Sequence, residues 1–271
     1  MSVRSACFAS LSFVLVAGGA VPAWADFSGC ESAYQATDPR TQVTHYTTCL
    51  KEGQLGSPEA VAFAYNNRGV AHMHLGEIDP ALADFTAAIQ FDPTWGQWYF
   101  NRGQILLNRG DFLRAEADFD KAIKLQPGSE HAEAYASRGQ TRAQHGDIAG
   151  AIADFEAAIR GDRKLARAYA FEARLLVASP YTASRNGPKA LELALTLVTL
   201  TDGWLSRDTL AAAYAETGRF DEAVREQLRA IDLAKAAGGG PDAAGMAARL
   251  ALYQKGLPGY PPPSGARAAG G

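Results

Sequence analysis

Residues 65–69 read YNNRG, and the pattern returns as YFNRG at residues 99–103 and as YASRG at residues 135–139. A second motif, ADF, follows each of them, at residues 83–85, 117–119 and 153–155. The glycines of the first motif, Gly69, Gly103 and Gly139, recur at intervals of 34 and 36 residues. Self-similarity at such a period indicates a chain built from stacked structural repeats.

The two motifs resemble the tetratricopeptide repeat, a unit of two antiparallel helices. The family's signature positions in residues 62–95 are Tyr65, Gly69, His72, Ala81, Phe85, Ala88 and Pro93. In residues 96–129 they are Tyr99, Gly103, Leu106, Ala115, Phe119, Ala122 and Pro127. In residues 132–165 they are Tyr135, Gly139, Arg142, Ala151, Phe155 and Ala158, with Arg163 in place of the closing proline. A fourth unit begins at Tyr169 and has a longer turn at residues 179–188, and a fifth spans residues 210–230.

Recurrent glycine inside a helix needs a packing reason. Glycine costs about 1 kcal/mol relative to alanine in a helix interior. Its return in each unit therefore predicts that a second helix backbone approaches closely, with the small residues Ala81, Ala115 and Ala151 facing it. A hairpin of this kind cannot bury its apolar face alone, so neighbouring units are expected to stack.

The resemblance implies an all-α fold, a right-handed α-solenoid of stacked helical hairpins with about eleven helices. The expected organisation is a signal peptide over residues 1–25, a helical cap over residues 26–61, about five units over residues 62–236, a capping helix over residues 237–257 and a disordered tail over residues 258–271. The tail assignment rests on its proline and glycine content.

The N-terminal segment has the plan of a secretory signal peptide. Arg4 precedes an apolar run over residues 6–21, and Ala23-Trp24-Ala25 supplies small residues for cleavage after Ala25. The alternative is an uncleaved anchor helix. Export is expected to lead to the periplasm or outside the cell.

Two cysteines, Cys30 and Cys49, follow the signal peptide. An even pair in an exported chain predicts a disulfide. The alternatives are two free thiols or a metal pair, and the latter is disfavoured because no His or carboxylate cluster lies nearby in sequence.

Composition excludes several classes of function. The 271 residues are 47% hydrophobic and 20% charged, with 26 basic and 29 acidic side chains. With slightly fewer basic than acidic residues, the sequence shows no excess of positive charge that could bind nucleic acid. It carries no recognisable catalytic, phosphate-binding or haem motif, and His72 and His74 are two residues apart, so they cannot chelate from one helix face. We expect no enzyme activity, no cofactor and no metal.

Three charged residues repeat with the units. Arg68, Arg102 and Arg138 each stand 16 residues before an aspartate, namely Asp84, Asp118 and Asp154. We expect structural Arg–Asp pairs between helices, and solvated charges are the alternative.

The resemblance implies that the first helices of the units line a concave groove that binds a peptide. The groove positions are Phe63, Asn66, Asn67, Val70, His74, Phe100, Asn101, Gln104, Asn108, Ser137, Gln140, Gln144, Arg167, Phe171 and Arg174. In some family members, asparagines at the positions of Asn67 and Asn101 form a ladder of amides that can hydrogen-bond a peptide backbone. Arg167 and Arg174 supply at most part of the family's basic clamp for a C-terminal carboxylate.

These expectations define an exported scaffold or adaptor that binds an extended, weakly charged peptide or a partner domain, anchored by the two amides and by Phe63 and Phe100. A membrane-tethered assembly factor of the cell envelope is the alternative if the N-terminal segment is kept. An enzyme whose site is not visible in sequence is a third possibility.

Overall fold

The computed structural model of the protein describes residues 30, 35–53, 55–125, 131–178, 184–238 and 242–260. Within these residues all regular structure is helical, which confirms the predicted all-α class. The helices are α2 (Pro39–Glu52), α3 (Pro58–His74), α4 (Ile78–Phe91), α5 (Gly96–Asn108), α6 (Phe112–Leu125), α7 (His131–His145), α8 (Ile148–Gly161), α9 (Ala166–Ala178), α10 (Gly187–Leu200), α11 (Trp204–Glu216), α12 (Phe220–Ala236) and α13 (Ala243–Tyr253). The described residues thus contain twelve helices, where about eleven were expected. The predicted signal peptide lies outside the described residues.

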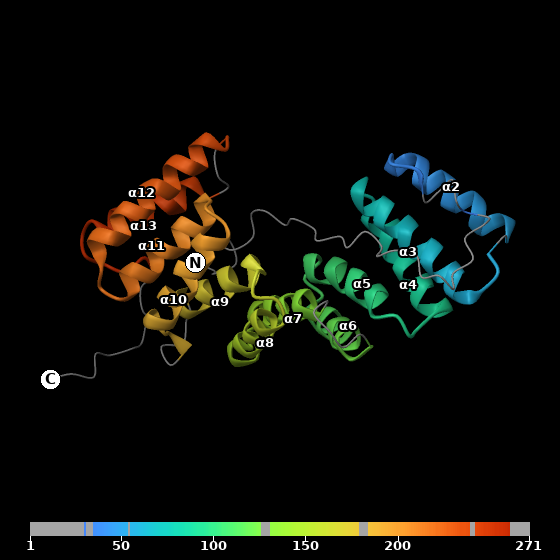
Figure 1. The fold of residues 1–271 in the computed structure, drawn as a ribbon, viewed down its shortest axis with the longest axis horizontal. Coiled ribbons are helices and arrows are strands. Elements are labelled where there is room, and N and C mark those ends of the chain that lie inside the picture. Colours follow the sequence, from blue (N-terminus) through green and yellow to red (C-terminus); the bar gives the residue numbers. More distant parts are fainter. Residues whose placement is uncertain are drawn as a thin grey trace. The chain divides into compact units, whose positions relative to one another are not determined.

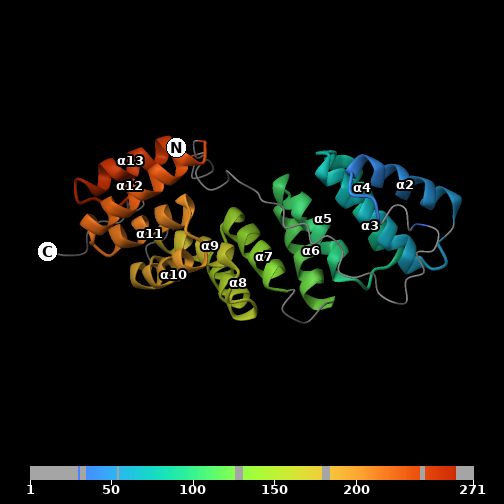
Figure 2. The ribbon, with the colours of Figure 1, turned by 45° about the horizontal axis from the view of Figure 1, so that its top comes forward.

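The helices group into two compact units, one ending at Thr141 and the other running from Arg142. In the first unit, α2 packs on α3, α3 pairs with α4, α4 packs on α5 and α5 pairs with α6 (Figure 1). In the second, α8 packs on α9, α9 pairs with α10, α11 pairs with α12, and α13 packs on α12 (Figure 2). Each unit is thus a series of helical hairpins, as the repeats predict.

Helix ends recur with the repeat. The turn between α3 and α4 contains Gly76 (φ 76°), and the turn between α5 and α6 contains Gly110 (φ 75°), so both occupy the left-handed region that favours glycine. Asp92 ends α4 and accepts a hydrogen bond from the Thr94 amide (2.9 Å). Asp162 ends α8 in the same way, which explains why Arg163 can replace the closing proline there.

The helix glycines of the first unit do face a close neighbour, but the nearest atoms belong to an aromatic ring of the second helix and not, as expected from the sequence, to its backbone beside Ala81 and Ala115. A Cβ at Gly69 would lie 2.8 Å from Cε1 of Phe85, and a Cβ at Gly103 would lie 2.9 Å from Cε1 of Phe119. Both phenylalanine rings are fully buried, at 0% exposure. The glycines therefore let an aromatic ring of the second helix rest directly on the backbone of the first.

Two of the expected Arg–Asp pairs are confirmed. Arg68 donates through Nε and Nη2 to Asp84 (2.9 and 2.7 Å), and Arg102 donates likewise to Asp118 (both 2.8 Å). Each joins the two helices of one hairpin, and the bonded carboxylate raises the pKa of both arginines. The third pair would join Arg138 of one unit to Asp154 of the other, so it is not described.

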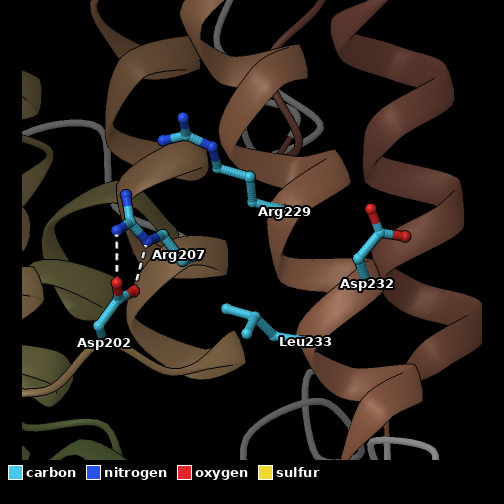
Figure 3. Close-up of a pocket in the computed structure, with 5 residues that line it drawn as sticks. All are labelled: Asp202, Arg207, Arg229, Asp232 and Leu233. Atoms are coloured by element: carbon cyan, nitrogen blue, oxygen red, sulfur yellow. Dashed lines mark hydrogen bonds and ion pairs between the residues drawn. The ribbon is translucent and has the colours of Figure 1, made fainter.

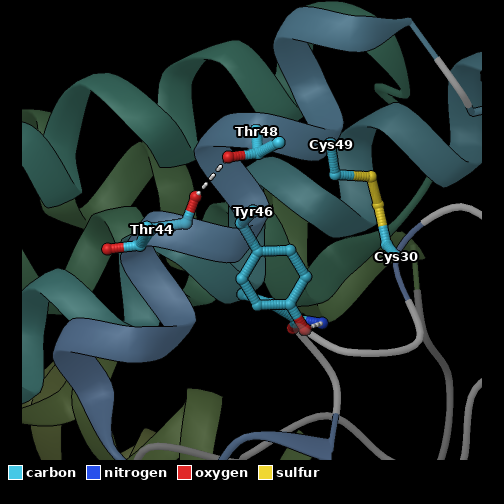
Figure 4. Close-up of a disulfide and its surroundings, with 6 residues drawn as sticks. Cys30, Thr44, Tyr46, Thr48 and Cys49 are labelled. Carbon is cyan, nitrogen blue, oxygen red and sulfur yellow. Dashed lines mark hydrogen bonds between the residues drawn. A yellow bond between two sulfur atoms is a disulfide. The ribbon is translucent and has the colours of Figure 1, made fainter.

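The N-terminal cap is fastened by the predicted disulfide. Cys30 and Cys49 are bonded, their Cα atoms lie 5.7 Å apart, and both are buried beside Tyr46 (Figure 4). This Cα separation is usual for a disulfide. Helix α2 begins with Pro39 after the cap residue Asp38, which accepts a hydrogen bond from the Thr41 amide (2.8 Å). The bond thus secures a capped helix on the edge of the array.

A buried carboxylate replaces an arginine of the repeat in α9. Glu172 occupies the position in its repeat that Arg138 occupies in the preceding repeat. Leu193 occupies the position that corresponds to Asp84. Glu172 is 1% exposed, and neither of its carboxylate oxygens has a hydrogen-bond partner among the described residues. Burial, with a smaller effect from Glu156, raises the pKa of Glu172 from 4.5 to about 7.

The end of the second unit is organised around another buried carboxylate. Asp208 of α11 is 1% exposed and accepts hydrogen bonds from Arg249 (2.7 Å), Gln227 (2.9 Å) and Arg174 (3.3 Å). Arg249 also donates to Asp242 (2.8 Å). These bonds hold α13, α12 and α9 to one group on α11. Residues 258–260, predicted as the start of the tail, are described and follow α13, whereas residues 261–271 lie outside the described residues.

Removing the disulfide should loosen the N-terminal cap. The Cys30→Ser/Cys49→Ser variant is expected to lose about 3 kcal/mol of stability, since the bond closes a loop of about 20 residues in the unfolded chain. Thermal unfolding followed by circular dichroism measures the loss. An unchanged melting temperature of the double serine variant, with the disulfide of the wild type verified by non-reducing mass spectrometry, would contradict this account.

Stability should depend on the protonation of Glu172. The folded chain binds the Glu172 proton more tightly than the unfolded chain, so the unfolding free energy falls as pH rises from 4.5 to about 7. Glu172→Gln should therefore gain up to about 3 kcal/mol at pH 8 and little at pH 4.5.

Urea unfolding at the two pH values tests this expectation, with Asp232→Asn on the exposed face of α12 as the matched control. The neighbouring charges on α8 and α10, namely Glu156, Arg160, Lys189 and Glu192, stay unchanged in both variants. A Glu172→Gln variant that is destabilised equally at both pH values would show that the carboxylate is paired.

Candidate functional site

The first helices of the first unit are joined by a continuous chain of side-chain amides. Gln97 of α5 donates to Asn101 Oδ1 (2.8 Å), whose Nδ2 donates to Asn66 Oδ1 of α3 (2.8 Å). Asn66 Nδ2 donates to Asn67 Oδ1 (3.2 Å), and Asn67 Nδ2 donates to the Tyr46 hydroxyl of α2 (3.2 Å). The chain crosses three helices with every donor oriented in one direction.

The predicted groove residues divide by exposure. The buried members are Phe63, Asn66, Phe100, Asn101, Ser137 and Gln140. The half-buried members are Asn67, Val70, Gln104, Gln144, Arg167, Phe171 and Arg174. The exposed members are His74 and Asn108. Of the nine residues that are half-buried or exposed, five lie on α3 and α5 and four on α7 and α9.

The two aromatic groove positions are parts of the core. Phe63 meets Trp98 edge to face, with ring centroids 4.8 Å apart, and Phe100 lies 5.9 Å from Phe119. Each is 5% exposed. The sequence-based expectation that Phe63 and Phe100 anchor a peptide directly is therefore corrected. Their rings pack inside the protein, against Trp98 and Phe119, and so help to position α3 and α5.

The asparagine ladder also differs from its expected form. Asn101 is 3% exposed, and both ends of its amide are engaged by Gln97 and Asn66. Asn67, by contrast, is half-buried at the boundary between the amide chain and solvent. Each amide oxygen has two lone pairs and each amide nitrogen two hydrogens, so Asn67 keeps one acceptor and one donor position beyond its bonds in the chain.

The groove positions of α9 interact among themselves and with neighbouring helices. The Arg167 guanidinium lies 5.8 Å above the ring of Phe171, and this ring stacks on Phe155 at 5.7 Å. Arg174 donates to Asp208 at 3.3 Å. Neither arginine is therefore arranged as an open clamp for a carboxylate.

Sequence reasoning missed the Asp208 cluster. Its members come from four helices and form no motif, but one signal was present in the repeat: Gln227 occupies the position of Phe85, so an amide replaces a core aromatic ring. A polar residue at a core position indicates a buried partner, because an unpaired buried amide would cost about 1–3 kcal/mol.

A surface pocket lies between α11 and α12 (Figure 3). Asp202, Arg207, Arg229, Asp232 and Leu233 line it. Arg207 donates twice to Asp202 (2.7 and 2.8 Å), which lowers the pKa of that carboxyl, and once to Glu226 (2.9 Å). Arg229 also donates to Glu226 (3.0 Å). Since both arginines are bound to carboxylates, we assign no ligand to this pocket.

Neither a metal centre nor a membrane span is found in the part of the chain that the structure describes. No three His, Cys, Asp or Glu side chains gather there as ligands of one ion. No described helix combines the length and the apolar character needed to cross a bilayer.

Models of one family match three parts of the sequence, each described as a tetratricopeptide repeat. The matched segments are residues 62–94, 100–166 and 205–239. They cover the hairpins α3–α4, α5–α8 and α11–α12. No curated protein matches the sequence.

Solved structures share the fold at low sequence identity. A tetratricopeptide repeat protein from Parabacteroides merdae has a TM-score of 0.61 and 18% identity, over 81% of each chain. YrrB, described as a TPR protein with an unusual peptide-binding site, has a TM-score of 0.57 and 18% identity, over 78% of this chain and 98% of its own. MamA from Desulfovibrio magneticus has a TM-score of 0.55 and 21% identity, over 65% of this chain and 96% of its own.

The repeated hairpins, their glycine–aromatic contacts and these matches agree with one another. The chain is a tetratricopeptide repeat protein.

Proposed function

We propose that this chain is an exported scaffold that binds an extended segment of a partner protein on the first helices of its N-terminal unit. Tetratricopeptide repeats serve generally as protein-interaction scaffolds. The observation that carries the proposal is the amide chain, which ends at the half-buried Asn67 and leaves it one donor and one acceptor for a peptide backbone.

The surroundings of Asn67 suit an uncharged, extended peptide. Val70 offers a half-buried apolar surface one helical turn away, and Gln104 offers a second half-buried amide on α5. The nearby arginines Arg68 and Arg102 are bound to Asp84 and Asp118, so they add little free charge. Backbone hydrogen bonds from Asn67 and Gln104 would thus dominate recognition, with little dependence on peptide charge.

The proposed compartment is the periplasm or the exterior of the cell. The disulfide between Cys30 and Cys49 supports it, since such bonds persist in oxidising compartments and are rare in the cytosol. The signal-peptide pattern of residues 1–25 agrees with export.

Asn101 is a less suitable position for a test than Asn67, because both of its bonds in the amide chain are shorter (2.8 Å, against 3.2 Å for both bonds of Asn67). Replacing Asn101 with alanine would leave the buried Asn66 oxygen without its donor, at a cost of about 1–3 kcal/mol. The stability loss would obscure any effect on binding.

The variant Asn67→Ala/Gln104→Ala should lose at least tenfold in affinity for peptides selected by the wild-type protein, because two backbone-binding amides disappear. Peptides selected from a random library of extended decamers provide the probe, and fluorescence anisotropy measures affinity. Asn67→Ala also removes the acceptor of the buried Asn66 amide group (3.2 Å), so the melting temperature should fall, and affinities are compared at a temperature at which circular dichroism shows both proteins folded.

Gln90→Ala on α4 is the matched control, since it removes an exposed amide from a second helix. It should leave binding unchanged. Equal affinity of the double variant and the wild type for the selected peptides would place the binding surface elsewhere.

A further inference from the structure

The described residues that follow α13 also contact the helices. After α13, Gly256 (φ 68°) closes the helix, and residues 257–260 continue as a segment without helix or strand. We call these residues, Leu257, Pro258, Gly259 and Tyr260, the C-terminal strap. Leu257 is 48% exposed, and the other three are half-buried.

The strap fits tightly against Tyr253 at one point. A Cβ at Gly259 would lie 2.7 Å from the Tyr253 hydroxyl and 3.0 Å from its Cε1. Tyr253 is itself 1% exposed, within the cluster formed by Ala211, Ala215 and Ala223, so its ring has little room to yield. The position thus admits glycine and excludes larger residues.

The next residue is held by its backbone and its ring. Arg185 donates through Nη1 to the Tyr260 carbonyl (3.0 Å) and to Glu216 (3.3 Å). The Tyr260 side chain packs against the apolar cluster of α9, α10 and α11, which includes Leu176, Leu193 and Leu210. In the recognition of extended peptides, main-chain hydrogen bonds provide affinity and side-chain contacts provide specificity.

The surface beneath the strap contains a buried polar group that is not hydrogen-bonded to any described residue. The Tyr253 hydroxyl is buried and has no hydrogen-bond partner among the described residues, although it lies against Gly259. Burial raises its pKa, so it stays protonated and can donate. An unsatisfied buried donor facing an irregular segment indicates that another backbone could satisfy it better.

We propose that the surface formed by Arg185, Tyr253 and the apolar cluster of α9–α11 is a recognition site for an extended peptide that carries glycine followed by an aromatic residue, and that the strap occupies this site as an intramolecular competitor. The partner would supply a Gly–Tyr pair, its glycine against Tyr253 and its ring on the apolar cluster. This site lies in the unit that begins at Arg142, so it is independent of the role proposed for Asn67.

The strap is suited to be displaced. The Tyr260 carbonyl accepts a hydrogen bond from Arg185, the Leu257 amide donates one to the Leu252 carbonyl of α13 (3.0 Å), and none of the four strap residues is fully buried. Segments with few buried contacts open locally at small free-energy cost. A segment tethered this closely acts at an effective concentration on the order of millimolar. A partner peptide therefore binds the intact chain more weakly than a chain whose strap is dislodged.

Fluorescence anisotropy of a labelled peptide with the sequence of residues 255–263 tests the proposal on the full chain. In Gly259→Ala the added Cβ dislodges the strap but leaves the receiving surface intact, so the peptide should bind this variant at least tenfold more tightly than the wild type. The same peptide with its glycine or its tyrosine replaced by alanine should lose at least tenfold in affinity.

Gly203→Ala is the matched control, since a Cβ there meets nothing within 4 Å, and it should bind the peptide as the wild type does. Circular dichroism verifies that both variants are folded. If the folded Gly259→Ala variant binds no more tightly than the wild type, or binds the alanine-substituted peptides equally well, the strap is only a structural end of the cap and the proposal is overturned.

Discussion

The contact on which the hairpins α3–α4 and α5–α6 depend is that between a helix glycine and the phenylalanine of the following helix. At Gly69 and Gly103 the missing Cβ lets the rings of Phe85 and Phe119 rest on the backbone of α3 and α5. The distances of 2.8 and 2.9 Å to a virtual Cβ leave no space for any other residue. Because an interior glycine weakens a helix by about 1 kcal/mol, packing at this contact must stabilise the hairpin by more than that amount.

The rest of the hairpin follows from this approach. With the two helices close together, the arginine before each glycine reaches the aspartate before each phenylalanine, as the Arg68–Asp84 and Arg102–Asp118 pairs show. Between these two hairpins, Asn101 of α5 donates to Asn66 of α3 and so continues the amide chain from one hairpin to the next. Where the repeat abandons the glycine, as at Ala173, the ion pair is also lost and Glu172 is buried without a partner.

Much of the fold could be predicted from the sequence, because the same residues recur at equivalent positions of several repeats. Period, helix ends, two ion pairs and the disulfide all follow from residues close in sequence or in equivalent positions. The burial of Phe63 and Phe100 could not be predicted, since it depends on rings contributed by Trp98 and Phe119 at particular rotamers.

The candidate sites show the same division. The repeat predicted that α3 and α5 carry polar groove positions, but it could not distinguish the engaged amide of Asn101 from the half-buried Asn67, because this difference depends on hydrogen bonds between helices. The Asp208 cluster and the C-terminal strap join residues more than 30 positions apart that share no motif. Only the three-dimensional packing brings them together.

The central claim is that glycine is required by close packing and not by flexibility. The measurement that tests it most directly is urea unfolding of Gly103→Ala and of Gly103→Ala/Phe119→Leu. Helix propensity alone predicts that Gly103→Ala gains about 1 kcal/mol. The packing account predicts a net loss of about 1–3 kcal/mol, because the new Cβ meets the buried Phe119 ring, and a smaller combined loss in the double variant than the sum of the single losses. A Gly103→Ala variant more stable than the wild type would contradict it.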